Sequence, residues 1–207
     1  MKRLIILTGS PLCHNPRVIK EATALAATGF SVEVLGAWLD PELKARDQAL
    51  LARLPFRFTP VLDAATQPWE WRKCRLCVKL ARLWHQYTGR ESVWQLGYVT
   101  HALARTVRTR RHQTDLFIAH SEPALWAVSQ LQNRKSEIGN RKCAVGVDME
   151  DWFSEDLPLE TRRHRPVKLL RSLEQNVLCK GQYATCTSRA MSEALAKEYG
   201  CRPPTVM

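Results

Sequence analysis

Four short polar segments hold the side chains of this 207-residue sequence that are best suited to chemistry. Each follows an apolar run of the kind that forms a buried strand. Because ligands of open parallel sheets bind beyond the carboxyl ends of strands, we expect the four segments to face one site. They are Gly9–Asn15, His120–Pro123, Asp148–Phe153 and Ser188–Arg189.

His120 is the candidate for proton transfer. It stands at the end of the apolar run 115–119, where an imidazole can move a proton or hold a hydroxyl group. Glu122, two residues later, could orient that ring or bind a substrate. The position of His120 is equally compatible with a buried, hydrogen-bonded structural histidine.

Asp148, Glu150 and Asp151 place three carboxylates within four residues. Such a group can bind a metal ion, but the segment contains no histidine and hydrophobic residues interrupt it. Capping of a helix or binding of sugar hydroxyls is the favoured interpretation of these groups, and we expect no metal.

The first and fourth segments each lead into a helix. Asn15 before Pro16 is a strong helix N-cap, and a helix N-terminus favours anions. The segment Gly9–Asn15 is therefore a candidate anion site, although an ordinary strand-to-helix turn would have the same sequence. Ser188 is a candidate site residue, but a plain cap of the helix that follows it is the favoured interpretation. The glycine signatures of dinucleotide-binding and P-loop folds are absent from the sequence.

Strand and helix patterns alternate along the chain. This alternation predicts an α/β fold, a Rossmann-like doubly wound and mostly parallel sheet with helices on both faces, in a single domain over 1–207. We expect helices over 16–28, 123–131, 167–179 and 188–199, a helical region over 69–111 and a polar loop over 133–142. We expect strands over 4–8, 31–35, 56–62, 115–119, 143–147, 183–187 and 205–207.

The composition limits the class of protein. The net charge of +11 implies an anionic partner. Seven scattered cysteines, with Cys74 and Cys77 as the one C-x-x-C pair, indicate free thiols rather than a zinc site. The apolar run at the N-terminus is too short for a signal peptide, and no run is long enough to span a membrane. We therefore expect a cytoplasmic protein, soluble or peripheral at the inner face of the membrane.

Residues 69–112 hold ten lysines and arginines against two glutamates, interleaved with tryptophans. This composition is typical of a helix that binds an anionic membrane surface. A solvated basic face over a tryptophan-rich core is the alternative. Nucleic acid is disfavoured because no recognised binding motif is present. The candidate membrane-binding residues are Trp71, Arg72, Lys73, Arg75, Lys79 and Arg82.

Several segments, in order, resemble the family 4 glycosyltransferases of the GT-B fold. The first is Asn15-Pro16-Arg17-Val18, continued by Glu21-Ala22 and the run 29–34. Residues 115–120 resemble the strand-then-histidine segment of that family, and residues 185–191 its last strand-to-helix turn. Residues 148–153 resemble a further segment, in which Glu150 stands where the family has histidine.

The resemblance implies that this chain is the acceptor-binding, amino-terminal half of an enzyme that transfers a sugar from a nucleotide-sugar with retention and without a metal. His120 would lie at the reaction centre, Ser10 and Asn15 would face the donor phosphates, and Asp148 and Ser188 would line the cleft. The acceptor would be lipid-linked or a cell-surface glycan precursor. We expect the donor-binding domain to be absent from these residues, so the chain alone would not catalyse transfer. A non-catalytic membrane-associated or interaction module with the same fold is the alternative.

Overall fold

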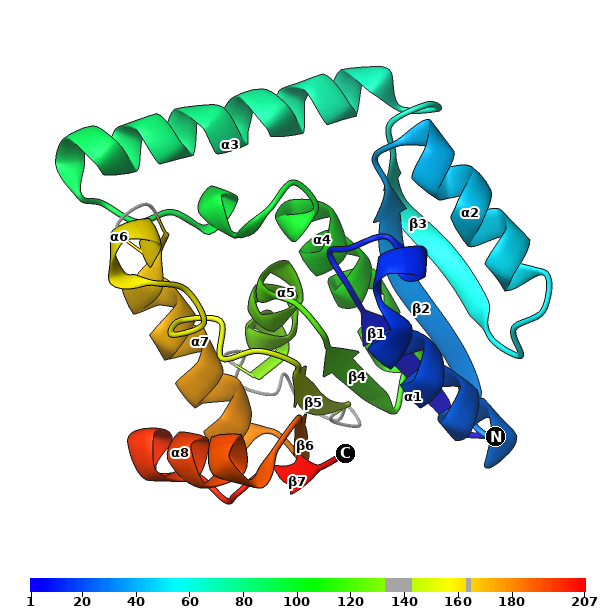
Figure 1. Ribbon diagram of the computed structural model, residues 1–207. Helices are drawn as coiled ribbons and strands as arrows, with labels where there is room; N and C mark the ends of the chain where they lie inside the picture. Colours follow the sequence, from blue (N-terminus) through cyan, green and yellow to red (C-terminus); the bar gives the residue numbers. More distant parts are fainter. Residues whose placement is uncertain (133–142, 163–164) are drawn as a thin grey trace.

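Seven parallel strands form one sheet in this computed structural model, which describes residues 1–132, 143–162 and 165–207. Their order across the sheet is β3-β2-β1-β4-β5-β6-β7 (Figure 1). The strands are β1 (Arg3–Leu7), β2 (Ser31–Trp38), β3 (Arg57–Asp63), β4 (Leu116–Ala119), β5 (Ala144–Met149), β6 (Tyr183–Cys186) and β7 (Thr205–Val206). The predicted α/β class and all seven predicted strands are confirmed, with ends that differ by at most three residues.

The direction in which the chain adds strands reverses between β1 and β4. The strands β1, β2 and β3 extend the sheet to one side, and β4 to β7 extend it to the other. Ile5 of β1 pairs with Glu33 of β2 on one side and with Phe117 of β4 on the other. Such a reversal is the position at which open α/β sheets bind ligands.

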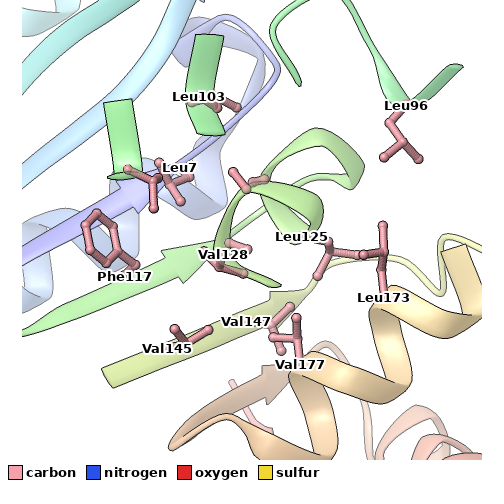
Figure 2. Packing of buried hydrophobic residues seen from close by; sticks show 14 of the residues in the cluster. Leu7, Leu96, Leu103, Phe117, Leu125, Val128, Val145, Val147, Leu173 and Val177 are labelled. Atoms are coloured by element: carbon pink, nitrogen blue, oxygen red, sulfur yellow. The ribbon is translucent and has the colours of Figure 1, made fainter. Parts of the chain in front are cut away.

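Both faces of the sheet are covered, and β1 shows how. Successive side chains of a strand point to opposite faces. Ile5 and Leu7 belong to one apolar cluster, and Leu4 and Ile6 belong to the other. The first and larger cluster packs under α4 (Thr100–Arg110), α5 (Glu122–Gln132) and α7 (Val167–Lys180). Figure 2 shows that cluster.

The helix α1 (Pro16–Ala27) covers the second face. Val18 and Ala22 are buried in the second cluster because apolar residues recur along the helix at helical spacing. The side chain of Asn15 accepts a hydrogen bond from the Val18 amide at 3.2 Å, so Asn15 caps the helix as the sequence predicts. Gly29, with a φ of 88°, follows the end of the helix.

The helix α2 (Pro41–Leu51) is not predicted by the sequence analysis, because it has no apolar stripe. The residue that it buries is a carboxylate, Asp47. Asp47 accepts hydrogen bonds from the amides of Leu12 and Cys13, at 3.1 and 2.7 Å, and from the indole of Trp38 at 3.2 Å. This carboxylate therefore fixes the segment Gly9–Asn15 that follows β1.

The basic region 69–112 is helical, as predicted, but it is divided. The long helix α3 (Pro68–Thr88) ends at Gly89, whose φ is 67°. A 3₁₀ turn (Val93–Leu96) and α4 follow. Figure 1 shows α3 on the outside of the molecule. The remaining helices are α6 (Leu159–Arg162) and α8 (Arg189–Tyr199). The predicted loop 133–142 lies outside the described residues.

Candidate functional site

Two of the four predicted segments meet at the reversal point of the sheet. The amide of Gly9, after β1, donates a hydrogen bond to the Ser121 hydroxyl, after β4, at 2.8 Å. A Cβ atom at Gly9 would lie 2.7 Å from Cγ of Pro123, so only glycine permits this approach without displacement. The segments Gly9–Asn15 and His120–Pro123 therefore form one surface, as expected.

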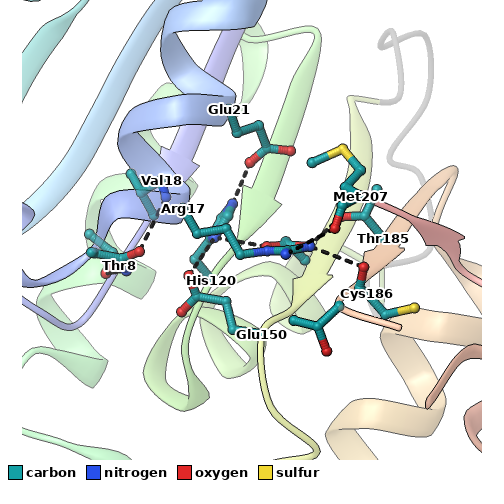
Figure 3. A network of polar contacts seen from close by, with 12 residues as sticks. Thr8, Arg17, Val18, Glu21, His120, Glu150, Thr185, Cys186 and Met207 are labelled. Carbon is teal, nitrogen blue, oxygen red and sulfur yellow. Dashed lines mark hydrogen bonds and ion pairs between the residues drawn. The ribbon is translucent and has the colours of Figure 1, made fainter. Parts of the chain in front are cut away.

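His120 lies behind that surface and is 2% exposed. Its Nε2 atom forms a short contact with a carboxylate oxygen of Glu21 on α1. Its Nδ1 atom lies 3.4 Å from Oδ2 of Asp148 and 4.0 Å from Oε1 of Glu150 (Figure 3). Three carboxylates from two different elements thus surround one imidazole.

Asp148 is fully buried and paired with Arg17 of α1. The guanidinium contacts both oxygens of the carboxylate, with an Nη2–Oδ1 distance of 2.7 Å. The Thr185 hydroxyl of β6 donates to the same Oδ1 at 2.5 Å. Arg17 also donates to the carbonyls of Cys186 and Met207, at 3.1 and 3.3 Å. One arginine therefore joins α1 to the carboxyl ends of three strands.

The environment separates the pKa values of the two neighbouring carboxyls. Burial alone would raise the pKa of Asp148, but hydrogen bonds from Arg17 and Thr185 and the charge of His120 outweigh it and lower that pKa. Burial raises the pKa of Glu150, and the negative charge of Asp148 adds to the effect. Asp148 is therefore held ionised, whereas Glu150 takes up a proton more readily.

Glu150 opens the cluster to solvent. Its side chain is 27% exposed, whereas those of His120 and Asp148 are 0% exposed. The opposite side is closed by Tyr183, whose hydroxyl donates to the second oxygen of Glu21 at 2.5 Å. Burial and the Glu21 charge both raise the pKa of Tyr183, so this hydroxyl stays protonated. Glu150 is therefore the solvent-accessible member of the cluster.

The segment after β5 is anchored on α7 and α8. Glu174 accepts hydrogen bonds from the amide and hydroxyl of Ser154, at 2.9 and 2.7 Å, and from the Tyr199 hydroxyl at 2.5 Å. The Trp152 indole donates to Tyr199 at 3.2 Å. These bonds fix the backbone of residues 152–154, and with it the path of the chain directly after Asp148 and Glu150.

The other predicted site residues have identifiable structural partners. The Ser10 amide and the Asn15 side chain donate to the buried Thr8 hydroxyl, at 3.1 and 3.2 Å. Glu122 forms an ion pair with Arg165. Ser188 is exposed and caps α8 by accepting from the Met191 amide at 3.2 Å. The structure thus brings His120 and Asp148 together. For Ser10, Asn15, Glu122 and Ser188, substrate binding stays a prediction.

Sequence reasoning gave no individual role to Arg17, Glu21, Tyr183 or Thr185. The spacing of Arg17 and Glu21, four residues apart in a helix, places both on one face. Glu21 also falls within the apolar stripe of that helix, where a buried acid requires a partner. These two signals identify a buried polar cluster but not the strand that completes it.

The predicted membrane-binding residues divide between two faces of α3. The side chains of Arg72, Lys73, Arg75, Lys79 and Arg82 are exposed. Trp71 instead packs toward the body of the molecule, edge-on to Tyr98 with 4.9 Å between ring centroids. The exposed apolar side chains of this helix include two of the interleaved tryptophans, Trp69 and Trp84. The others, which sequence reasoning did not single out, are Leu76, Leu80, Leu83 and Tyr87.

In comparisons with known proteins, no family model matches the sequence and no curated protein matches it significantly. In the part of the chain that the structure describes, no helix is both long and apolar enough to cross a membrane. The seven cysteines, all within the described residues, are free thiols.

Replacing Arg17 by methionine tests the electrostatic account of the cluster. At neutral pH we expect a loss of about 3–5 kcal/mol in the free energy of unfolding, because Asp148 is left as an unpaired buried charge. Burial is the largest of the effects on the pKa of Asp148, so we expect that pKa to lie above its unfolded value once Arg17 is removed. The cost of ionising it is present at neutral pH and disappears as the pH falls toward about 4. Urea denaturation across this pH range measures the difference in the free energy of unfolding between wild type and Arg17→Met, which should become smaller as the pH falls.

Arg171 provides the matched control, because its side chain is 51% exposed and it pairs with Glu155. Arg171→Met should cost less than about 1 kcal/mol. Equal losses for the two variants, or a loss at Arg17 that does not change with pH, would contradict the account.

Proposed function

We propose that residues 1–207 are the acceptor-side domain of an enzyme that transfers a sugar from a nucleotide-sugar to an acceptor hydroxyl. The observation that carries this proposal is the cluster of His120, Asp148 and Glu150 beside the reversal point of a parallel sheet. Ligands bind at such points. The ordered resemblance to family 4 glycosyltransferases supplies the reaction class.

In this proposal the acceptor hydroxyl approaches from the Glu150 side of the cluster. Glu150 is the partly exposed member, and His120 lies 4.0 Å behind it. Nε2 of the imidazole contacts Glu21, and its Nδ1 atom lies beside Asp148. The contact with Glu21 keeps the orientation of the ring fixed, as a group at a reaction centre requires. The helix α1 begins beside the segment Gly9–Asn15, and its N-terminus would favour donor phosphates.

The donor nucleotide is bound elsewhere in this proposal, by a second domain of the GT-B type in the same or another polypeptide. Residues 1–207 alone should therefore show no measurable transfer, and transfer should require that domain. Turnover of a nucleotide-sugar by the isolated 207 residues would contradict the division of labour between the two domains.

Deletion of the gene from its source cell tests the reaction class. We expect one glycan or glycolipid to disappear and its unglycosylated acceptor to accumulate, as measured by mass spectrometry of extracts. Expression of the wild-type protein in the deletion strain should restore the product. Expression of His112→Ala should restore it as well, because His112 is exposed and outside the cluster. His120→Ala should restore it at a rate lower by about 10²–10⁴-fold, the usual contribution of a positioned acid or base.

Glu150→Gln serves as the second variant, since a partly exposed side chain is less important for folding than His120. Unfolding transitions of both variants should be measured beside the product. An unchanged set of glycans in the deletion strain, or full activity of a folded His120→Ala protein, would contradict the proposal.

A second candidate function, attachment to an anionic membrane surface, is favoured by the geometry of α3. Its buried side rests on the body through Trp71, Cys74, Val78 and Ala81. At about 100° per residue, the exposed apolar side chains lie on the opposite side of the helix. Trp69 is 74% and Tyr87 is 86% exposed. An exposed apolar stripe on the side of a helix that faces away from the core indicates a site of interaction with another surface.

Basic side chains form one flank of that exposed stripe. Arg72, Arg75, Lys79 and Arg82 recur at intervals of three and four residues, and Glu70 is the acidic residue of the helix. An apolar stripe bordered by cations matches an interface of anionic lipid, which takes up the apolar groups and attracts the charges. This surface is compatible with a lipid-linked acceptor and equally with a non-catalytic membrane module.

Vesicle sedimentation tests the second candidate. Each lysine or arginine near an anionic surface contributes about 1 kcal/mol, so replacing the four flanking cations by glutamine should weaken binding to anionic vesicles by at least about 100-fold. At high salt, where charges are screened, the remaining binding to vesicles should come from the apolar side chains. Replacing Leu76, Leu80 and Leu83 by serine should abolish that binding.

The matched control neutralises four exposed cations outside α3, namely Lys2, Lys20, Lys197 and Arg202. This variant has the same net charge as the α3 variant and should retain binding. Equal partitioning of the wild-type chain to neutral and anionic vesicles at low salt, or an equal loss in the control, would contradict the proposal.

A further inference from the structure

Three potential metal ligands converge at the carboxyl ends of β4 and β5. One ligand atom each from His120, Asp148 and Glu150 lies within 4.8 Å of the other two. The histidine directly follows β4, whereas the carboxylates lie at and just after the end of β5, which is why the sequence segment 148–153 lacks it. One imidazole and two carboxylates are a donor set that first-row divalent cations accept.

The Nδ1 atom of His120 is the unsatisfied group of the cluster. The side chain is 0% exposed, and Nδ1 makes no hydrogen bond. Its nearest neighbours are Asp148 Oδ2 at 3.4 Å and Glu150 Oε1 at 4.0 Å, both beyond good hydrogen-bonding distance. A buried polar atom without a partner is rare and requires an explanation.

The opposite nitrogen of His120 faces Glu21. When the ring carries a single proton, on Nε2, it donates that proton to the Glu21 carboxylate, and the lone pair of Nδ1 points at Asp148 and Glu150. Histidines that bind metals commonly donate their other ring N–H to a carboxylate in this way, which fixes the tautomer. Glu21 itself is held by Tyr183, so the ring has a fixed orientation.

The charges around His120 leave a negative surplus. Within residues 1–132, 143–162 and 165–207, the carboxylates of Glu21, Asp148 and Glu150 face one permanent cation, Arg17. The hydroxyls of Tyr183 and Thr185 donate hydrogen bonds but carry no charge. Arg17 does not exclude a second cation at Asp148, because an ionised carboxylate has about four acceptor sites on its two oxygens.

We propose that His120 Nδ1, Asp148 and Glu150 bind a divalent first-row metal ion such as Mn²⁺, with Glu21 orienting the histidine. The exposed side of Glu150 admits the ion and leaves coordination positions for water or a substrate oxygen. This inference differs from what the resemblance implies, which is a metal-independent enzyme, and it depends on Glu150, the residue that departs from the family pattern. It does not depend on the proposed sugar transfer.

Titration of the chelator-treated chain with Mn²⁺ alone, followed by electron paramagnetic resonance, tests the site. Mn²⁺ is the suitable probe because soft thiolates select zinc and the chain carries seven free cysteines. We expect one bound ion per chain, and selective broadening of the His120 imidazole proton signals in NMR spectra while those of His112 remain sharp. Absence of binding up to about 1 mM, or broadening of His112 alone, would overturn the proposal.

Three variants locate the ion. Glu150→Gln removes a ligand and should weaken binding at least about tenfold, and Glu21→Gln should weaken it by about 10- to 100-fold through the orientation of His120. Asp151→Asn removes the same charge from the exposed neighbouring position and should change affinity only a few-fold. Equal effects of Glu150→Gln and Asp151→Asn would show general attraction of cations and overturn the site.

Discussion

The ion pair between Arg17 and Asp148 is the interaction on which the polar centre of this protein depends. Asp148 is buried completely at the end of β5, and a buried carboxylate is tolerated only with a charged or hydrogen-bonding partner. Its partner comes from α1, on the other side of the reversal point of the sheet. The same guanidinium reaches the carbonyls of Cys186 and Met207. One side chain therefore connects the first β-α unit to β5, β6 and the chain end after β7.

Once Asp148 is fixed, the environment of His120 follows. The imidazole lies between Glu21 of α1 and Asp148 of β5, and Glu150 lies on the solvent side. A negatively charged cluster with one partly exposed carboxylate suits a substrate hydroxyl and suits a divalent cation. The surface of α3 is a separate feature, since it results from an apolar stripe opposite the side of the helix that packs on the body.

The central strands β1, β4 and β5 were predictable because each is a short, largely apolar run, as Leu4–Leu7 illustrates. The shared edge of His120 and Asp148 followed from parallel topology. The contacts of Arg17 and Glu21 did not, because helical spacing gives the face of a residue but not its partner on a distant strand. The helix α2 was missed because Asp47, rather than an apolar stripe, holds it in place. Trp71 and Trp69 are two residues apart on α3, and only the packing of the helix decides which is exposed.

A double-mutant cycle on Arg17 and Asp148 measures the central interaction most directly. The free energy of unfolding at neutral pH would be determined by urea denaturation for wild type, Arg17→Met, Asp148→Asn and the double variant. We predict a coupling energy of about 1–3 kcal/mol, with the double variant more stable than the two single losses imply. Additivity within about 0.5 kcal/mol would contradict the account, because residues that do not interact show such additivity.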